Sequence, residues 1–198
     1  MLRRMKGMTL AMNLPNKLTL LRVILVPFFL LFLLVDQIPL HGLWALVIFA
    51  AASITDAMDG HIARSRGLIT DFGKFLDPVA DKVLVFAALI AFVELGLASS
   101  VAVVIMMARE FLVSSMRMVA ASKGRVIAAG KSGKVKTAVT MVSIVAILLL
   151  LALEDFAIGA AIPLAAVSNV LIWICGVITV YSGVEYLVQN KDVFTGSM

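Results

Sequence analysis

Four aspartates in two apolar segments are the residues of this sequence best suited to chemistry. Asp56 and Asp59 lie three residues apart, and Asp77 and Asp81 lie four residues apart. In a helix, each of these spacings places both carboxylates on one face. A short connection between two such helices would bring the two faces together in an antiparallel hairpin. Because charged groups are costly within a membrane, the cluster indicates a functional site.

The chemistry that such a cluster favours is the binding of divalent cations. Converging carboxylates repel one another and tend to stay protonated in a medium of low dielectric constant. Oxygen ligands without a His or Cys at matching spacing favour Mg²⁺, Mn²⁺ or Ca²⁺ over zinc, and Mg²⁺ commonly takes substrate phosphate oxygens as further ligands. The cluster therefore predicts a diphosphate-bearing substrate. Gly60 and Ala63 continue the Asp56 face with almost no side chain, which leaves room for a nucleobase, with simple helix packing as the alternative.

The elements that must position these residues are membrane helices. Of the 198 residues, 62% are hydrophobic and 15% are charged, whereas soluble domains are about 45–50% apolar. We predict an all-α polytopic membrane protein with six transmembrane helices in a single domain, residues 1–198, and a short interfacial helix within residues 1–17. The six predicted spans cover residues 18–35, 43–63, 77–97, 99–120, 135–153 and 162–188.

The distribution of basic residues predicts the orientation. With six spans, both termini share one side with the second and fourth connections, and those segments hold all the Lys and Arg residues outside the spans. Positive residues mark the cytoplasmic side, so we expect a multi-pass protein of the cell (inner) membrane with both termini and the acidic cluster cytoplasmic. The net charge of +5 is then a topology signal and an attraction to anionic lipids, with no nucleic acid partner expected.

A second group of charged residues lies in the fourth span and at the start of the fifth. Arg109 and Glu110 lie midway along the fourth span, Arg117 follows on roughly the same face, and Lys134 and Lys136 open the fifth. Arginine and lysine both bind phosphate oxygens. We therefore expect Arg109, Arg117 and Lys134, with Lys136 as an addition, to bind a phosphate on a second substrate. Neutralisation of Arg109 by Glu110 or another carboxylate and simple exposure of the lysines are the alternatives.

The acidic segments resemble the signature of the CDP-alcohol phosphatidyltransferase family. The residues that carry the resemblance are Asp56-x2-Asp59-Gly60-x2-Ala63-Arg64-x8-Gly73-x3-Asp77-x3-Asp81, and no fixed position departs from it. The resemblance implies a six-helix membrane enzyme, usually a homodimer, in which an alcohol displaces CMP from a CDP-linked lipid. It also implies two divalent ions, Mg²⁺ or Mn²⁺, in each site.

The resemblance further implies a role for each motif residue. Asp56, Asp59 and Asp77 would be metal ligands, and Asp81 would be both a ligand of the second metal and the general base. The residues implied to bind the nucleotide end of the donor are Gly60, Ala63, Arg64, Gly73, Asn16 and Thr19. For Asn16, an N-terminal helix cap is an equal alternative.

Over nearly its full length, the chain is also similar to the phosphatidylglycerophosphate synthase branch of this family in bacteria. The similar stretches are residues 13–22, 108–111 and 133–138. This resemblance implies CDP-diacylglycerol as donor and glycerol 3-phosphate as acceptor. Inositol phosphate and a second phosphatidylglycerol remain alternative acceptors, whereas serine carries no phosphate for the basic residues.

Two alternatives come from other classes of protein. A cation transporter would also carry acidic residues within the membrane, but it predicts broken helices or paired repeats, and Gly and Pro do not interrupt the spans in a repeated way. A metal-dependent prenyltransferase would need clustered aspartates, but the Asp-Gly-x2-Ala-Arg arrangement does not suit it.

Overall fold

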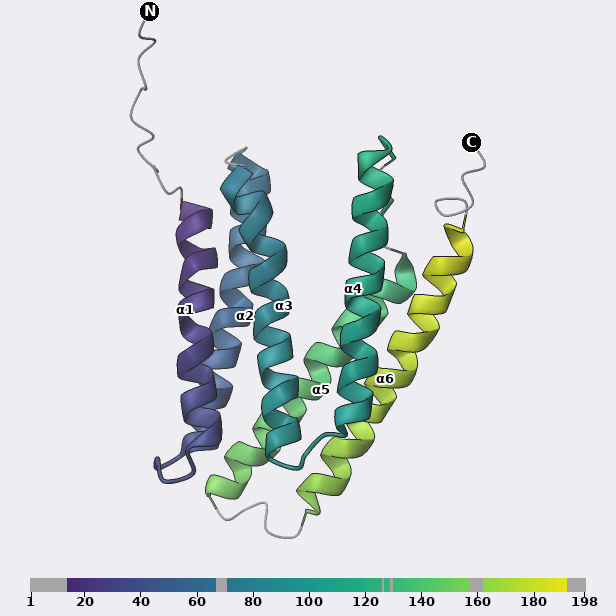
Figure 1. The fold of residues 1–198 in the computed structure, drawn as a ribbon. Coiled ribbons are helices and arrows are strands. Elements are labelled where there is room, and N and C mark those ends of the chain that lie inside the picture. Colours follow the sequence, from purple (N-terminus) through teal and green to yellow (C-terminus); the bar gives the residue numbers. More distant parts are fainter. Residues whose placement is uncertain (1–13, 67–70, 126, 129, 157–161, 192–198) are drawn as a thin grey trace, which may run out of the picture.

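The fold is a bundle of six helices (Figure 1). The structure, a computed structural model, describes residues 14–66, 71–125, 127–128, 130–156 and 162–191, and it describes the side chains in those ranges except at 14–18, 56–66, 71–78 and 81. No strand occurs in these ranges. The helices are α1 (Leu14–Leu34), α2 (His41–Arg66), α3 (Asp71–Glu94), α4 (Ser100–Ser122), α5 (Lys131–Asp155) and α6 (Leu164–Gln189).

Successive helices run in alternating directions, so each helix has one of its two ends at the same end of the bundle (Figure 1). At this end, which we call the site end, α1, α3 and α5 begin and α2, α4 and α6 end. The predicted all-helical fold is confirmed. The acidic segments in α2 and α3 and the basic start of α5 belong to the same end, as the sequence predicted.

Several predicted helix boundaries were wrong. The connection between α2 and α3 was expected to be about nine residues long, but α2 continues to Arg66 and α3 starts at Asp71, which leaves residues 67–70 between them. The apolar pattern ends earlier than the helices because polar residues occupy the helix ends. The predicted interfacial helix falls mainly in residues 1–13, outside the described residues, and residues 14–17 belong to α1.

The core forms where α1 packs against α2 and α3 and where α5 packs against α2 and α6, while α4 packs against α6. Phe29, Phe49 and Phe92 are fully buried, and the Phe29 and Phe49 ring centroids lie 5.6 Å apart. By contrast, α3 and α4 make limited direct contact. This weak packing leaves room between them for the cavity described below.

Within the part of the chain that the structure describes, two helices, α5 and α6, are long and apolar enough to cross a membrane. Large apolar side chains cover the outside of the bundle, with Val142 69% exposed and Val177 65% exposed. An apolar exterior of this extent is typical of a protein in contact with lipid hydrocarbon. The middle of α4, in contrast, carries Arg109, Glu110 and Arg117.

At Gly42, α2 and α5 approach each other closely, at the end of the bundle opposite the site. A Cβ atom there would lie 2.8 Å from the carbonyl carbon of Leu151 and 3.0 Å from the backbone nitrogen of Ala152. Next to it, the Leu43 amide donates a 3.0 Å hydrogen bond to Asp155 Oδ2. Any larger residue at position 42 must therefore separate two backbones.

We expect Gly42→Ala to destabilise the protein by about 1–3 kcal/mol, because overpacking against backbone cannot be relieved by a rotamer change. Thermal unfolding in detergent, followed by circular dichroism, would measure the effect. Gly176→Ala is a matched control, since a Cβ there would lie 3.8 Å from the Ala102 Cβ, an ordinary contact. Equal midpoints for the two variants would show that the α2–α5 contact tolerates the methyl group.

Candidate active site

The acidic motif lies on two helices that meet at the site end. Asp56 and Asp59 belong to the second half of α2, and Asp77 and Asp81 belong to the first half of α3. Their side chains are outside the described part of the structure, as are those of Ala63 and Arg64 and the surroundings of Gly60 and Gly73. The convergence of the four carboxylates and their binding of metal therefore stay predictions. Among the described side chains, no group of three or more His, Cys, Asp or Glu residues could hold a metal ion.

A cavity of about 750 Å³, which we call the basic cavity, lies between α3, α4 and α5. One of its walls is Lys82, which directly follows Asp81 in α3, so the cavity borders the acidic motif. Four cations and one carboxylate line it, which makes it suited to an anion. Its lining residues are Lys82, Arg109, Glu110, Val113, Ser114, Arg117, Gly133, Lys134, Thr137 and Ala138.

Three of the four residues predicted to bind a phosphate meet in this cavity: Arg109, Arg117 and Lys134. Within the described residues, no carboxylate forms an ion pair with Arg117 or Lys134. Lys134 is exposed and lies in the first turn of α5. These two cations are therefore available to an anion that enters the cavity.

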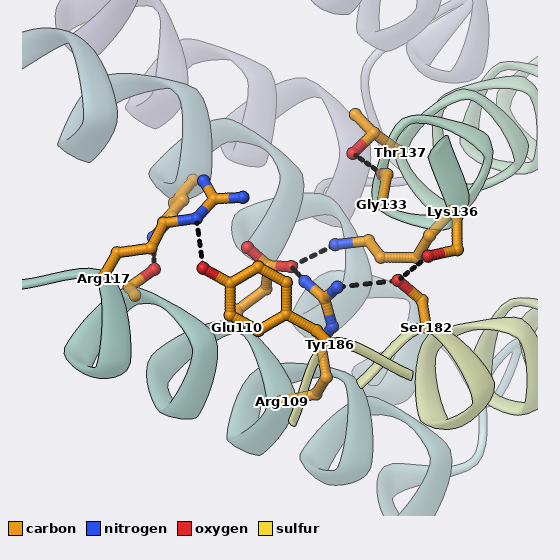
Figure 2. Close-up of polar contacts among 11 residues, drawn as sticks. Arg109, Glu110, Arg117, Gly133, Lys136, Thr137, Ser182 and Tyr186 are labelled. Carbon is orange, nitrogen blue, oxygen red and sulfur yellow. Dashed lines mark hydrogen bonds and ion pairs between the residues drawn. The ribbon is translucent and has the colours of Figure 1, made fainter. Parts of the chain in front are cut away.

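The side chain of Arg109 is held by one residue of its own helix, α4, and by one residue of α6 (Figure 2). Its Nη1 donates a 2.8 Å hydrogen bond to Glu110 Oε1, and its Nη2 donates a 2.8 Å hydrogen bond to Ser182 Oγ in α6. Gly183 permits this approach, because a Cβ at that position would lie 2.9 Å from Arg109 Cγ. The neutralisation of Arg109 by Glu110, considered as an alternative from the sequence, is observed, although Arg109 still lines the cavity.

Lys136 differs from the other three predicted residues. Its side chain is 9% exposed, and its Nζ forms an ion pair with Glu110 Oε1 (Figure 2). It lines a second cavity of about 60 Å³, which shares Lys82, Glu110 and Thr137 with the basic cavity. Lys136 does not line the basic cavity itself, but it forms an ion pair with Glu110, which does. The Glu110 carboxylate holds both Lys136 and Arg109 in place.

Tyr186 of α6 holds Arg117 in two ways (Figure 2). The Nε of Arg117 donates a 3.2 Å hydrogen bond to the Tyr186 hydroxyl. The guanidinium carbon also lies 5.4 Å from the centre of the tyrosine ring, within the range of a cation–π interaction. Because Tyr186 is only 5% exposed, it is a rigid support for an otherwise exposed arginine.

In α1, Thr19 is fully buried, and Arg22, one turn later, is fully buried as well. The side chain of Asn16 is outside the described part, so the role of Asn16 and Thr19 at the nucleotide stays a prediction. Sequence reasoning assigned no role to Arg22, Lys82, Ser114, Ser182 or Tyr186. The signal for Arg22 and Lys82 was present, because each is a cation within a predicted span.

The comparisons with known proteins place the chain in a transferase family. It belongs to the CDP-alcohol phosphatidyltransferase family, whose model matches residues 12–181. It is 39% identical over 200 residues to the CDP-diacylglycerol-glycerol-3-phosphate 3-phosphatidyltransferase of Bacillus subtilis, covering 93% of this chain and 98% of that protein. It is 37% identical over 179 residues to the probable phosphatidylglycerophosphate synthase of Mycobacterium tuberculosis, covering 89% and 81%. These findings confirm the resemblance predicted from the sequence.

Proposed function

We propose that this protein transfers the phosphatidyl group of CDP-diacylglycerol to glycerol 3-phosphate and releases phosphatidylglycerophosphate and CMP. The observation that carries the proposal is the position of the basic cavity beside the acidic motif. Lys82 of the cavity wall directly follows Asp81, so an acceptor phosphate bound there would lie next to the proposed site of the donor diphosphate. Membership of the family and the activities for which the relatives are named support the same reaction.

The metal content of the site is part of the proposal. Asp56, Asp59, Asp77 and Asp81 would hold two divalent ions, Mg²⁺ or Mn²⁺. A donor set made of carboxylates alone, on two helices that meet at one end of the bundle, fits these hard cations. When bound, the ions would neutralise negative charge on the diphosphate and on the departing CMP.

The residues of the chain supply positioning and proton transfer. Arg117, Lys134 and Arg109 bind the acceptor phosphate, which leaves the hydroxyl at the other end of the three-carbon acceptor free to attack. Its oxygen forms a bond to the phosphatidyl phosphorus as the bond from that phosphorus to the CMP oxygen breaks. Asp81 takes the hydroxyl proton, because an alcohol is a weak nucleophile until it is deprotonated.

The proposed topology places this reaction at the cytoplasmic face of the cell membrane. All six helices would span the bilayer, with both termini cytoplasmic and the acyl chains of the donor between helices. The distribution of Lys and Arg supports this orientation. Assembly as a homodimer, typical of the family by resemblance, is proposed as well.

The test is CMP release by purified protein in detergent with CDP-diacylglycerol, Mg²⁺ or Mn²⁺, and one acceptor at a time. We expect metal-dependent release with glycerol 3-phosphate and loss of release on chelation. Release only with inositol phosphate would retain the donor chemistry and overturn the proposed acceptor. Cation transport without CMP release would favour the transporter hypothesis instead.

The Tyr186→Phe variant tests the support of Arg117. Losing one hydrogen bond to a charged group costs about 1.5 kcal/mol or more, so we expect KM for glycerol 3-phosphate to rise about tenfold. The ring and its cation–π contact remain, so the effect should be smaller than that of Tyr186→Leu. Steady-state CMP release at varied acceptor concentration measures both. Equal KM values for wild type and both variants would rule out this support.

A further inference from the structure

Lys82 is a fourth cation of the basic cavity that neither the acidic motif nor the predicted phosphate-binding residues include. Its half-buried side chain lines both the basic cavity and the 60 Å³ cavity. Its Nζ donates a hydrogen bond to Ser114 Oγ in α4. Among the described side chains, this is the one hydrogen bond that joins α3 to α4, so Lys82 extends across the cavity from one wall to the other.

The hydrogen bond fixes where the Lys82 charge lies. Ser114 follows Glu110 by four residues and precedes Arg117 by three, so these three residues lie on one face of α4. The ammonium group is therefore beside this face, between Glu110 and Arg117. An ammonium group has three donors, and Ser114 takes one of them.

Among the described side chains, Glu110 is the carboxylate nearest to Lys82, and Lys82 does not form an ion pair with it. Glu110 is engaged by Arg109 and Lys136, and within the described residues no carboxylate pairs with Lys82. Several cations that line one cavity repel one another unless an anion lies between them. A phosphate that accepts hydrogen bonds from Lys82, Arg117 and Lys134 would remove this repulsion.

We infer that Lys82 binds the phosphate of the acceptor directly and helps to select a phosphorylated alcohol. The inference rests on the proposed function and adds a determinant of substrate class to the same site. Lys82 also directly follows the proposed base Asp81, with adjacent Cα atoms about 3.8 Å apart. An acceptor held by Lys82 is thus held close to the residue that must deprotonate it.

The experiment compares Lys82→Met, Lys82→Arg and Lys131→Met by CMP release at varied glycerol 3-phosphate and at varied CDP-diacylglycerol. Lys131→Met is the matched control, because it removes an exposed lysine at the same end that does not line the cavity. Lys82→Met should raise KM for glycerol 3-phosphate at least about tenfold and leave KM for the donor within about twofold. Lys82→Arg should recover part of the loss, and Lys131→Met should resemble wild type.

A second readout does not depend on turnover. Inorganic phosphate should raise the unfolding temperature of the wild-type protein in detergent without donor, and Lys82→Met should weaken this protection. If the wild type releases no CMP with glycerol 3-phosphate but phosphate protects it in a Lys82-dependent way, the proposed acceptor fails and the phosphate site stands.

Two results would overturn the inference. One is a Lys82→Met enzyme with an unchanged KM for glycerol 3-phosphate and unchanged protection by phosphate. The other is a rise in KM for the donor alone, which would place Lys82 at the diphosphate. If Lys82→Met does not fold, Lys82→Gln provides the same comparison with a polar side chain of similar size.

Discussion

Replacement of Asp81 by asparagine is expected to reduce CMP release by roughly a thousandfold or more. A positioned general base contributes about a hundred- to ten-thousandfold, and the variant also loses a proposed metal ligand. Asparagine keeps the size of the side chain but cannot accept the hydroxyl proton. Single-turnover CMP release with saturating glycerol 3-phosphate and Mg²⁺ would measure the loss in the chemical step.

The control for this variant is Asp36→Asn, an identical change at an exposed position in the connection between α1 and α2. It should retain wild-type rates. Asp56→Asn separates the two roles of Asp81, since Asp56 is proposed to be a metal ligand alone. Raised Mn²⁺ should rescue Asp56→Asn more than Asp81→Asn. Full turnover by Asp81→Asn would remove Asp81 from the role of base.

The helices of this protein could be predicted from its sequence because each apolar segment has the length of a membrane crossing. The residues at which the helices begin and end could not be predicted in this way. Residues 64–66 are Arg-Ser-Arg, and residues 71–76 include Asp71, Gly73 and Lys74. Hydropathy therefore assigns both segments to a loop, yet they extend α2 and α3. Polar residues form helix outside the hydrocarbon, where hydropathy carries no signal about backbone conformation.

The basic cavity could be predicted in part. Arg109 and Arg117 are eight residues apart and lie on one face of α4, which helical periodicity predicts. Lys136 follows Lys134 by two residues, a rotation of about 200°, so one helix cannot direct both side chains into one cavity. Lys136 accordingly lies in the interior against Glu110.

The partners of the cavity residues could not be predicted, because they come from distant parts of the chain. Arg117 meets Tyr186 across 69 residues, and Lys82 meets Ser114 across 32. No local pattern encodes such a pair. Only the packing of α6 and α3 around α4 brings these side chains together, and the packing depends on the whole bundle.

Arg117→Ala is expected to raise KM for glycerol 3-phosphate by roughly a hundredfold, because one guanidinium can donate two hydrogen bonds to a phosphate and each costs about 1.5 kcal/mol or more to lose. Steady-state CMP release at varied acceptor concentration measures this change. The KM for CDP-diacylglycerol should stay within about twofold, since an interaction made by the acceptor alone does not enter donor binding.

Two further variants show whether the effect belongs to the phosphate site. Arg117→Lys keeps the charge but loses the planar pair of donors and the support of Tyr186, so its KM should fall between those of wild type and Arg117→Ala. Arg125→Ala removes an exposed arginine beyond the end of α4 and should leave the acceptor KM unchanged. An acceptor KM that is equally high in Arg125→Ala would mean that Arg117 attracts the substrate only through the general positive charge of the site end. The basic cavity would then need another ligand.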